Sequence, residues 1–104
     1  PLTFDCSNLL NFYQTFFGCS ILNSDLTFIN TSNLTNVANM FYACSAFNSN
    51  VNFDDTSNIT TMSSMFRGCV AFNKPLNFDT SSVTDMSSMF RYSSLFNQDI
   101  SGWN

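Results

Sequence analysis

The chain has 104 residues, a length that suits one domain, and it carries a net charge of −4 with only three basic residues. So few cations exclude the clustered lysines and arginines of a nucleic-acid-binding surface and make a poor anchor for anionic lipid. No apolar run approaches the roughly 20 residues that span a bilayer, so we expect no membrane insertion. The 13 phenylalanines exclude a disordered chain, which would be poor in aromatic residues.

Internal repeats organise the whole chain. The clearest copy covers residues 56–73, recurs at 31–48 and 80–97, and has a weaker counterpart at 6–23. We therefore expect one stack of repeats, because each unit needs its neighbours to bury its apolar face. We also interpret the chain as a segment of a longer repeat array. The expected repeats are approximately residues 1–25, 26–50, 51–75 and 76–100, with a partial copy at 101–104.

Each repeat opens on two apolar residues separated by one other residue. This alternation predicts a short strand with both side chains pointing inward. In one repeat Pro75 comes directly before the pair, a position that a strand tolerates at its start. The four pairs are Leu2/Phe4, Leu26/Phe28, Val51/Phe53 and Leu76/Phe78.

The period then changes from two to about 3.6. Apolar residues recur at i, i+3, i+6 and i+7, which predicts one face of a helix. Thr56 and Ser57 stand where an N-cap belongs, and Gly68 stands where the helix would stop. In the third copy the apolar residues are Ile59, Met62, Met65 and Phe66.

One helix and one short parallel strand for about every 25 residues predict an α/β repeat solenoid of leucine-rich-repeat-like design. Helices pack about 10 Å apart, whereas strands lie about 4.8 Å apart. We therefore expect the stack to curve, with the parallel sheet on its concave side.

Three series of equivalent residues are expected to form structural ladders along the stack. The phenylalanines should stack in the interior, and the asparagines should satisfy backbone groups of neighbouring coils. The cysteines should lie one above another, with Ser93 in the last copy. The three ladders are Phe16, Phe41, Phe66 and Phe90; Asn23, Asn48, Asn73 and Asn97; and Cys19, Cys44 and Cys69.

The cysteine position admits three interpretations. The first is a buried small side chain that serine can replace. The second is a disulfide between neighbouring coils. The third is a metal site, which the lack of histidine and of closely spaced cysteine pairs argues against. Cys6 lies at a different position of the repeat.

The carboxylates have a capping interpretation and a metal-binding one. Asp5, Asp55 and Asp79 precede the expected helices, where an anion can cap free amides. A Ca²⁺ site built by adjacent loops is the alternative, although Asn30 interrupts the series. We expect no other cofactor. The full set is Asp5, Asp25, Asp54, Asp55, Asp79, Asp85 and Asp99.

Residues that depart from the repeat pattern are the candidates for surface binding. The residues directly after the helical phenylalanine, Tyr42, Arg67 and Arg91, should form an outer column with Phe17. Tyr92 is a further candidate surface aromatic. Three sequons, at Asn30, Asn33 and Asn58, are possible N-glycosylation sites. Regular Thr-Ser pairs invite an ice-binding interpretation, but their place at a helix start favours capping. The candidate surface-binding residues are Tyr42, Arg67, Lys74 and Arg91.

Residues 79–90, continued by residues 96–103, resemble the repeat of BspA-like leucine-rich-repeat surface proteins of microbes. The resemblance covers essentially the whole chain and is weakest in the first copy, where Thr15 replaces methionine. It implies a surface-displayed or extracellular module that acts in adhesion or recognition. The family has no shared catalytic residues to carry over.

No enzymatic function is expected, because the chain lacks a histidine base, glutamate and a glycine-rich phosphate loop. The first functional hypothesis is a non-enzymatic module at the cell surface that binds a protein or glycan on its concave sheet. The alternative is a structural building block of an extracellular filament or large assembly, formed through end-to-end or lateral packing with further copies of the repeat.

Overall fold

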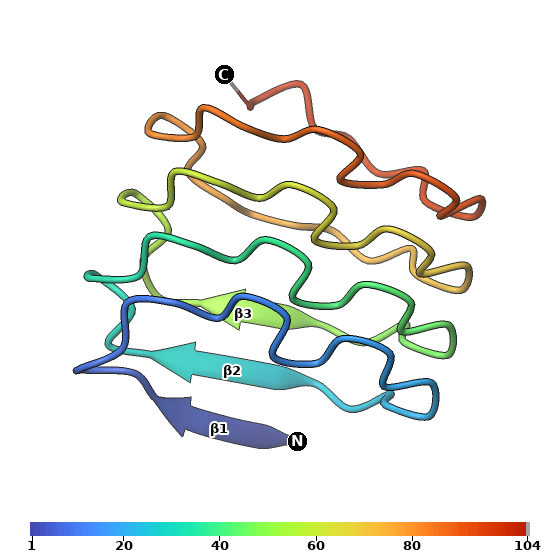
Figure 1. Cartoon of the computed structure of the whole chain (residues 1–104), viewed down its shortest axis with the longest axis horizontal. Coiled ribbons are helices and arrows are strands. Elements are labelled where there is room, and N and C mark those ends of the chain that lie inside the picture. The colour runs from blue at the N-terminus through green and yellow to red at the C-terminus, as the bar shows by residue number, and fades with distance from the viewer. Residues whose placement is uncertain (104) are drawn as a thin grey trace.

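The chain winds into a stack of coils, each combining a short extended segment with a longer series of turns (Figure 1). The computed structural model describes residues 1–103, with overall dimensions of 31 × 28 × 20 Å. The coils follow one another from the N-terminal coil to the C-terminal coil, which form opposite ends of the stack (Figure 1). We call residues 6–23, 31–48, 56–73 and 80–97 the four turn segments.

Three strands form one parallel sheet in the order β1-β2-β3, namely β1 (Leu2–Asp5), β2 (Leu26–Ile29) and β3 (Val51–Phe53). The predicted alternation is confirmed in β2, where Leu26 and Phe28 are buried on either side of a half-buried residue. Phe28 pairs in register with Phe4 and with Phe53. Its ring stacks between theirs, with centroid separations of 5.3 and 4.9 Å.

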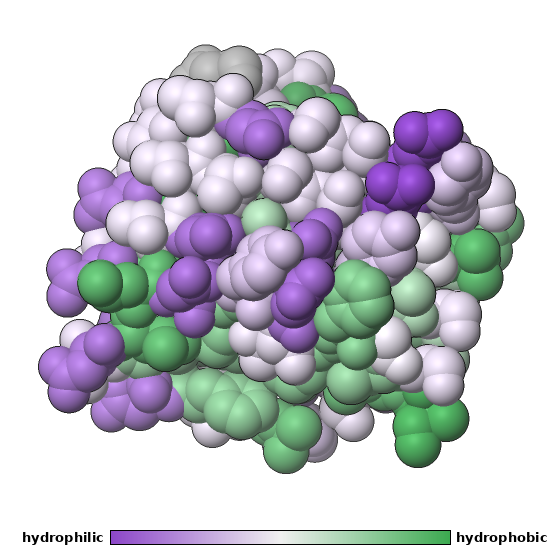
Figure 2. Space-filling view, in the orientation of Figure 1, coloured by the Kyte–Doolittle hydropathy of each residue, from purple (hydrophilic) through white to green (hydrophobic). Residues whose placement is uncertain are grey.

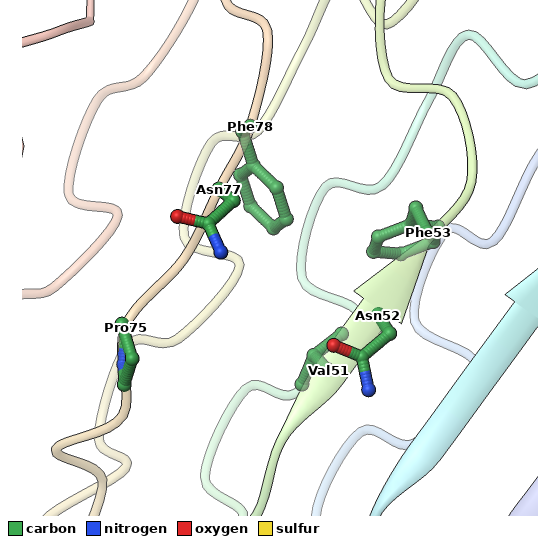
Figure 3. Close-up of a pocket in the computed structure, with 6 residues that line it drawn as sticks. All are labelled: Val51, Asn52, Phe53, Pro75, Asn77 and Phe78. Carbon is green, nitrogen blue, oxygen red and sulfur yellow. The ribbon is translucent and has the colours of Figure 1, made fainter.

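The strand expected around Leu76 and Phe78 is absent. Among the described residues, no backbone hydrogen bond joins β3 to residues 75–78, and only β3 of the two neighbouring segments is a strand (Figure 3). We attribute the difference to Pro75, whose ring fixes φ near −65° and removes the N–H that, at the equivalent Asn50, donates to the Asp25 side chain of the preceding coil. A cavity of about 170 Å³, lined by residues of β3 and of the next coil, opens where the sheet would have continued.

The predicted helices are wrong, since residues 1–103 contain none. Each turn segment is instead a run of tight turns in which an amide donates to the carbonyl three residues earlier. In the second coil, Met40 bonds to Val37 at 3.2 Å and Cys44 to Phe41 at 3.0 Å. Such turns return the chain to the core about every three residues, which produces the apolar spacing that predicted a helix.

Left-handed backbone at two positions of every turn segment prevents a helix from forming. Asn39 has φ of 57° and Ala43 has φ of 62°, and the equivalent residues of the other coils share this conformation. An L-residue visits that region singly and cannot propagate an α-helix through it. The other left-handed residues at these positions are Gln14, Ser64, Ser88, Gly18, Gly68 and Tyr92.

The α/β solenoid with one helix per repeat is therefore incorrect as a fold class: the described chain has three short parallel strands and no helix. The expected curvature of the stack was argued from helices that pack farther apart than strands, and without helices that argument does not apply. The phenylalanine stacking is nevertheless found. Phe66 lies parallel to Phe41 at 5.2 Å and to Phe90 at 5.8 Å, and Phe41 also stacks on Phe16 at 5.4 Å.

Candidate functional site

An aromatic–arginine ridge runs along the outside of the turn segments. It is formed by two adjacent positions of the repeat, directly after the stacked phenylalanine. The first position holds Phe17, Tyr42, Arg67 and Arg91 in the four coils, and the second adds Tyr92 in the last coil. The second position has left-handed backbone, including φ of 65° at Tyr92, and the residue that follows it is buried in the second, third and fourth coils.

The side chains of the ridge stack on one another across coils. Phe17 and Tyr42 lie nearly parallel with ring centroids 4.7 Å apart. The Cζ atom of Arg67 lies 5.3 Å from the Tyr42 ring and 5.5 Å from the Tyr92 ring. The Cζ atom of Arg91 lies 4.9 Å from the centroid of the same Tyr92 ring. The ridge thus begins with two stacked rings and continues with the two guanidinium groups, which share the ring of Tyr92.

Ring faces, rather than carboxylates, hold the two arginines in place. Among the described residues, neither Arg67 nor Arg91 forms an ion pair with a carboxylate. The Nε of Arg67 is buried and has no hydrogen-bond partner within residues 1–103. Stacking on an aromatic ring is electrostatically favourable and leaves the planar N–H edge of a guanidinium open for an acceptor.

The sequence-predicted surface residues divide into two groups. Tyr42, Arg67 and Arg91 lie together on the ridge, next to Phe17, which is 48% exposed. Lys74 does not join them. The pKa of Asp25 is lowered mainly by a hydrogen bond from the amide of Asn50, and the charge of Lys74 makes a smaller contribution in the same direction. The sequence indicated Tyr92 as a surface aromatic but not its position between the arginines, because its place in the repeat belongs to glycine or alanine in other coils.

The cysteine position has a hydrogen-bonding role that explains its exchange with serine. The thiols of Cys44 and Cys69 donate to the carbonyl oxygens of Phe16 and Phe41, each at 2.9 Å, and the hydroxyl of Ser93 donates to Phe66 in the same way. All four cysteines are free. The interpretation as a buried, serine-like side chain therefore describes this position in the structure, and no disulfide joins neighbouring coils.

These thiols are poor candidates for a nucleophile. Burial raises the pKa of Cys44 to about 11 and that of Cys69 to about 12. Burial is also the largest cause of the raised pKa of Cys6, followed by the charges of Asp5 and Asp54. Because the thiolate is the reactive form of cysteine, a raised pKa lowers reactivity at neutral pH.

The asparagine ladder links the coils through one repeated hydrogen bond. The side-chain Oδ1 of Asn23 accepts from the amide of Asn48 at 2.8 Å, and Asn48 accepts from Asn73 at 3.0 Å. Asn73 accepts from Asn97 at 2.9 Å. The expected structural role is therefore found, although these residues are exposed rather than turned inward.

The capping residues close turns rather than helices. Asp55 and Asp79 accept the amides of Ser57 and Ser81, two residues further on, at 2.8 and 3.0 Å. Asp5 makes the same bond to Ser7 at 3.1 Å. Short polar side chains commonly make such local bonds to the backbone.

The threonines that were expected to cap helices are buried between coils. Thr31 donates its hydroxyl to Asp54 at 2.6 Å and accepts the amide of Asp55 at 3.0 Å. Thr56 accepts the amide of Asp79 at 2.7 Å. Cys6 lies at the same position in the first coil and is also buried. Because these threonines are buried, they form no exposed array of the kind that ice binding requires.

Hydrogen bonds lower the pKa of six carboxyl groups below the ordinary value of 3.8. The largest cause is the Thr31 hydroxyl for Asp54 and the Ser81 hydroxyl for Asp79. No group of three or more potential metal ligands occurs within residues 1–103. The other four groups and their main donors are Asp5 with the Asn30 side chain, Asp25 with the Asn50 amide, Asp85 with the Ser87 amide and Asp99 with the Ser101 amide.

Two of the three sequon asparagines use their side-chain nitrogen within the fold. Asn30 donates to the carboxylate of Asp5 at 2.9 Å, and Asn58 donates to the carbonyl of Ser32 in the preceding coil. Asn33 is exposed. Glycan attachment at Asn30 or Asn58 would therefore replace a bond between neighbouring coils.

The comparisons with known proteins give one match. No curated protein and no solved structure matches the chain. No helix long and apolar enough to cross a membrane occurs among the described residues. A family model, described as "Mycoplasma protein of unknown function, DUF285", matches residues 2–54 and again residues 51–104. Two consecutive matches over nearly the full length agree with the repeat organisation, and the chain belongs to this repeat family.

Proposed function

We propose that the chain is a non-enzymatic recognition module that binds an anionic partner on its aromatic–arginine ridge. The observation that carries this proposal is the stacking of Arg67 between the rings of Tyr42 and Tyr92, without a carboxylate partner. A guanidinium held in this way is preorganised for a carboxylate, which it binds with two parallel hydrogen bonds. Tyrosine and arginine are also the residues that most often dominate the energy of an interface.

The partner is a protein or glycan that presents a carboxylate beside an apolar or ring face. The exposed rings of Phe17 and Tyr92 supply stacking surface next to the charged groups. This places recognition on the turn side of the stack, in contrast to the sheet face that the sequence favoured. The resemblance to BspA-like surface proteins supports an extracellular or cell-surface location and a role in adhesion.

A structural building block of an extracellular assembly is the second candidate. It is favoured by apolar side chains exposed on the outside of the first coil, such as Leu10 and Ile21, the latter being 91% exposed. Figure 2 shows apolar side chains gathered along the lower edge of the view. Large exposed apolar patches commonly mark interaction surfaces.

The ridge hypothesis is tested with immobilised glycans and peptides that differ only in the presence of carboxylates. The wild-type chain should bind the carboxylate-bearing members, and Arg67→Ala and Arg91→Ala should each weaken this binding at least about tenfold. Lys74→Ala is the matched control and should bind normally, because Lys74 lies off the ridge. Equal binding by Arg67→Ala, or no preference for carboxylates, would contradict the proposal.

A further inference from the structure

The edge of β3 that faces away from β2 carries backbone groups without a partner. In a parallel ladder, successive residues direct their N–H and C=O groups to opposite neighbours. The amide of Asp54, directly after β3, donates to Phe28 of β2 at 3.2 Å. Val51 and Phe53 therefore direct their amides and carbonyls the other way, toward residues 75–78. Within the described chain, these four groups have no hydrogen-bond partner.

The fourth extended segment stays close to β3 without supplying the missing partners. The amide of Asp79, equivalent to that of Asp54, donates to the hydroxyl of Thr56 at 2.7 Å instead of to β3. The rings of Phe53 and Phe78 nevertheless meet edge-on, with centroids 5.8 Å apart. An inserted strand would hold its two neighbours about 9.6 Å apart, twice the usual strand spacing. The gap is therefore too narrow for an added peptide strand.

A small cavity lies along this unpaired edge. It has a volume of about 170 Å³, and Asn52 and Asn77 flank it from the two segments (Figure 3). Neither of these side-chain amides has a hydrogen-bond partner among the described residues. None of the lining residues is charged, and the carboxylate of Asp54 is engaged by the Thr31 hydroxyl at 2.6 Å. The cavity thus offers hydrogen-bond donors and acceptors without a net charge.

The size and chemistry of this cavity fit one sugar ring. A water molecule fills about 30 Å³, whereas drug-sized ligands occupy pockets of about 300–1,000 Å³. A volume of about 170 Å³ lies between these values, in the range of a single pyranose. Each sugar hydroxyl both donates and accepts, which matches the mixture of amides and carbonyls on the edge of β3. The rings of Phe53 and Phe78, which also line the cavity, give the C–H face of a sugar an apolar surface.

We propose that the cavity between β3 and residues 75–78 binds one neutral hexopyranose, either free or as the last residue of a glycan. Its hydroxyls would accept from the amides of Val51 and Phe53 and donate to their carbonyl oxygens. The side chains of Asn52 and Asn77 would bind the outer hydroxyls. This site lies on the strand side, and it depends neither on the ridge nor on the building-block candidate.

The test titrates the intact chain with D-glucose, D-galactose and D-mannose and follows its amide signals by NMR. The backbone amides of Val51 and Phe53 should shift and saturate with at least one sugar. The dissociation constant should be about 1–10 mM, as expected for one small ring. The side-chain amide signals of Asn52 and Asn77 should shift with the same midpoint. The methyl glycoside of the binding sugar separates the two sources, since only a site for the end of a glycan accepts it.

Four variants show whether the sugar occupies this cavity. Asn52→Ala and Asn77→Ala each remove an exposed amide group and should weaken sugar binding at least about fivefold. Asn33→Ala is the matched control, because Asn33 is also exposed but does not line the cavity, and it should bind normally. Arg67→Ala should also bind normally, which separates this cavity from the ridge.

Three outcomes would overturn the proposal. The first is unchanged amide signals of Val51 and Phe53 at concentrations of all three sugars well above the expected dissociation constant. The second is an equal response to glycerol, which has hydroxyls but no ring. The third is sugar binding that is unchanged in either Asn52→Ala or Asn77→Ala.

Discussion

The turn side and the strand side of the stack hold their register in different ways. On the turn side, backbone bridges run without a break from Asn11 through Asn36 and Thr61 to Asp85. On the strand side, pairing stops after β3, and the fourth segment is joined by contacts such as the edge-on packing of Phe78 against Phe53 at 5.8 Å. Extended segments of three or four residues make so few hydrogen bonds that one proline can end the sheet.

Removing a ring from each side should make this difference visible. Phe66→Ala deletes a fully buried ring that stacks on Phe41, Phe72 and Phe90, and should lower the free energy of unfolding by about 3–5 kcal/mol. Phe53→Ala, at a half-buried position of the strand side, should cost only about 1–2 kcal/mol. Urea denaturation measures both values, and equal losses would contradict the dominance of the turn side.

Acid should loosen the turns before it affects the ring stacks. The lowered pKa values mean that the carboxylates stabilise the fold fully above the unfolded value of 3.8, and that this contribution is lost as the pH falls through the folded values. The melting temperature should therefore fall as the pH drops below about 4. Asp54→Asn is the matched variant, and its melting temperature should fall less than that of the wild type as the pH is lowered. A cooperative melting transition near neutral pH checks that the variant is folded.

The left-handed turns can be distinguished from a helix by whether one substitution stabilises or destabilises the chain. Ala43→Gly relieves an L-residue at φ of 62° and should stabilise the chain by about 0.5–1 kcal/mol. The same change inside a helix would destabilise it by about 1 kcal/mol. Ala46→Gly, at an exposed position without positive φ, is the control and should destabilise slightly. The midpoint of urea denaturation gives the sign.

The smallest global effect is expected from repairing the strand side. Pro75→Asn introduces the residue of the equivalent position, where the amide of Asn50 donates to Asp25 at 2.8 Å. Residues 76–78 should then pair with β3, and the amide of Asn77 should exchange more slowly. Global stability should change by less than about 1 kcal/mol, because losing proline also increases the entropy of the unfolded chain. Unchanged exchange at Asn77 would mean that the proline does not cause the split.

The repeat offsets predicted which residues stack, whereas the local geometry of the turn segments could not be predicted from them. Equivalent positions such as Phe41 and Phe66, or Asn48 and Asn73, were found in contact as the offsets required. The ridge could be predicted only in part, because Tyr92 stands at a position where other coils carry a residue without a ring. Its contact with the arginines depends on how the left-handed backbone directs the side chain.

By itself, the sequence determined the repeat, its register and the apolar residues that face the core, because stacked units must place like residues at like positions. Only the tertiary structure decided between helix and turns. Apolar residues three apart fit both, since both return the chain to the core at about that interval. The choice depends on where the amides find acceptors, and alternate amides, such as that of Asn39, bond to carbonyls of the next coil rather than within their own segment.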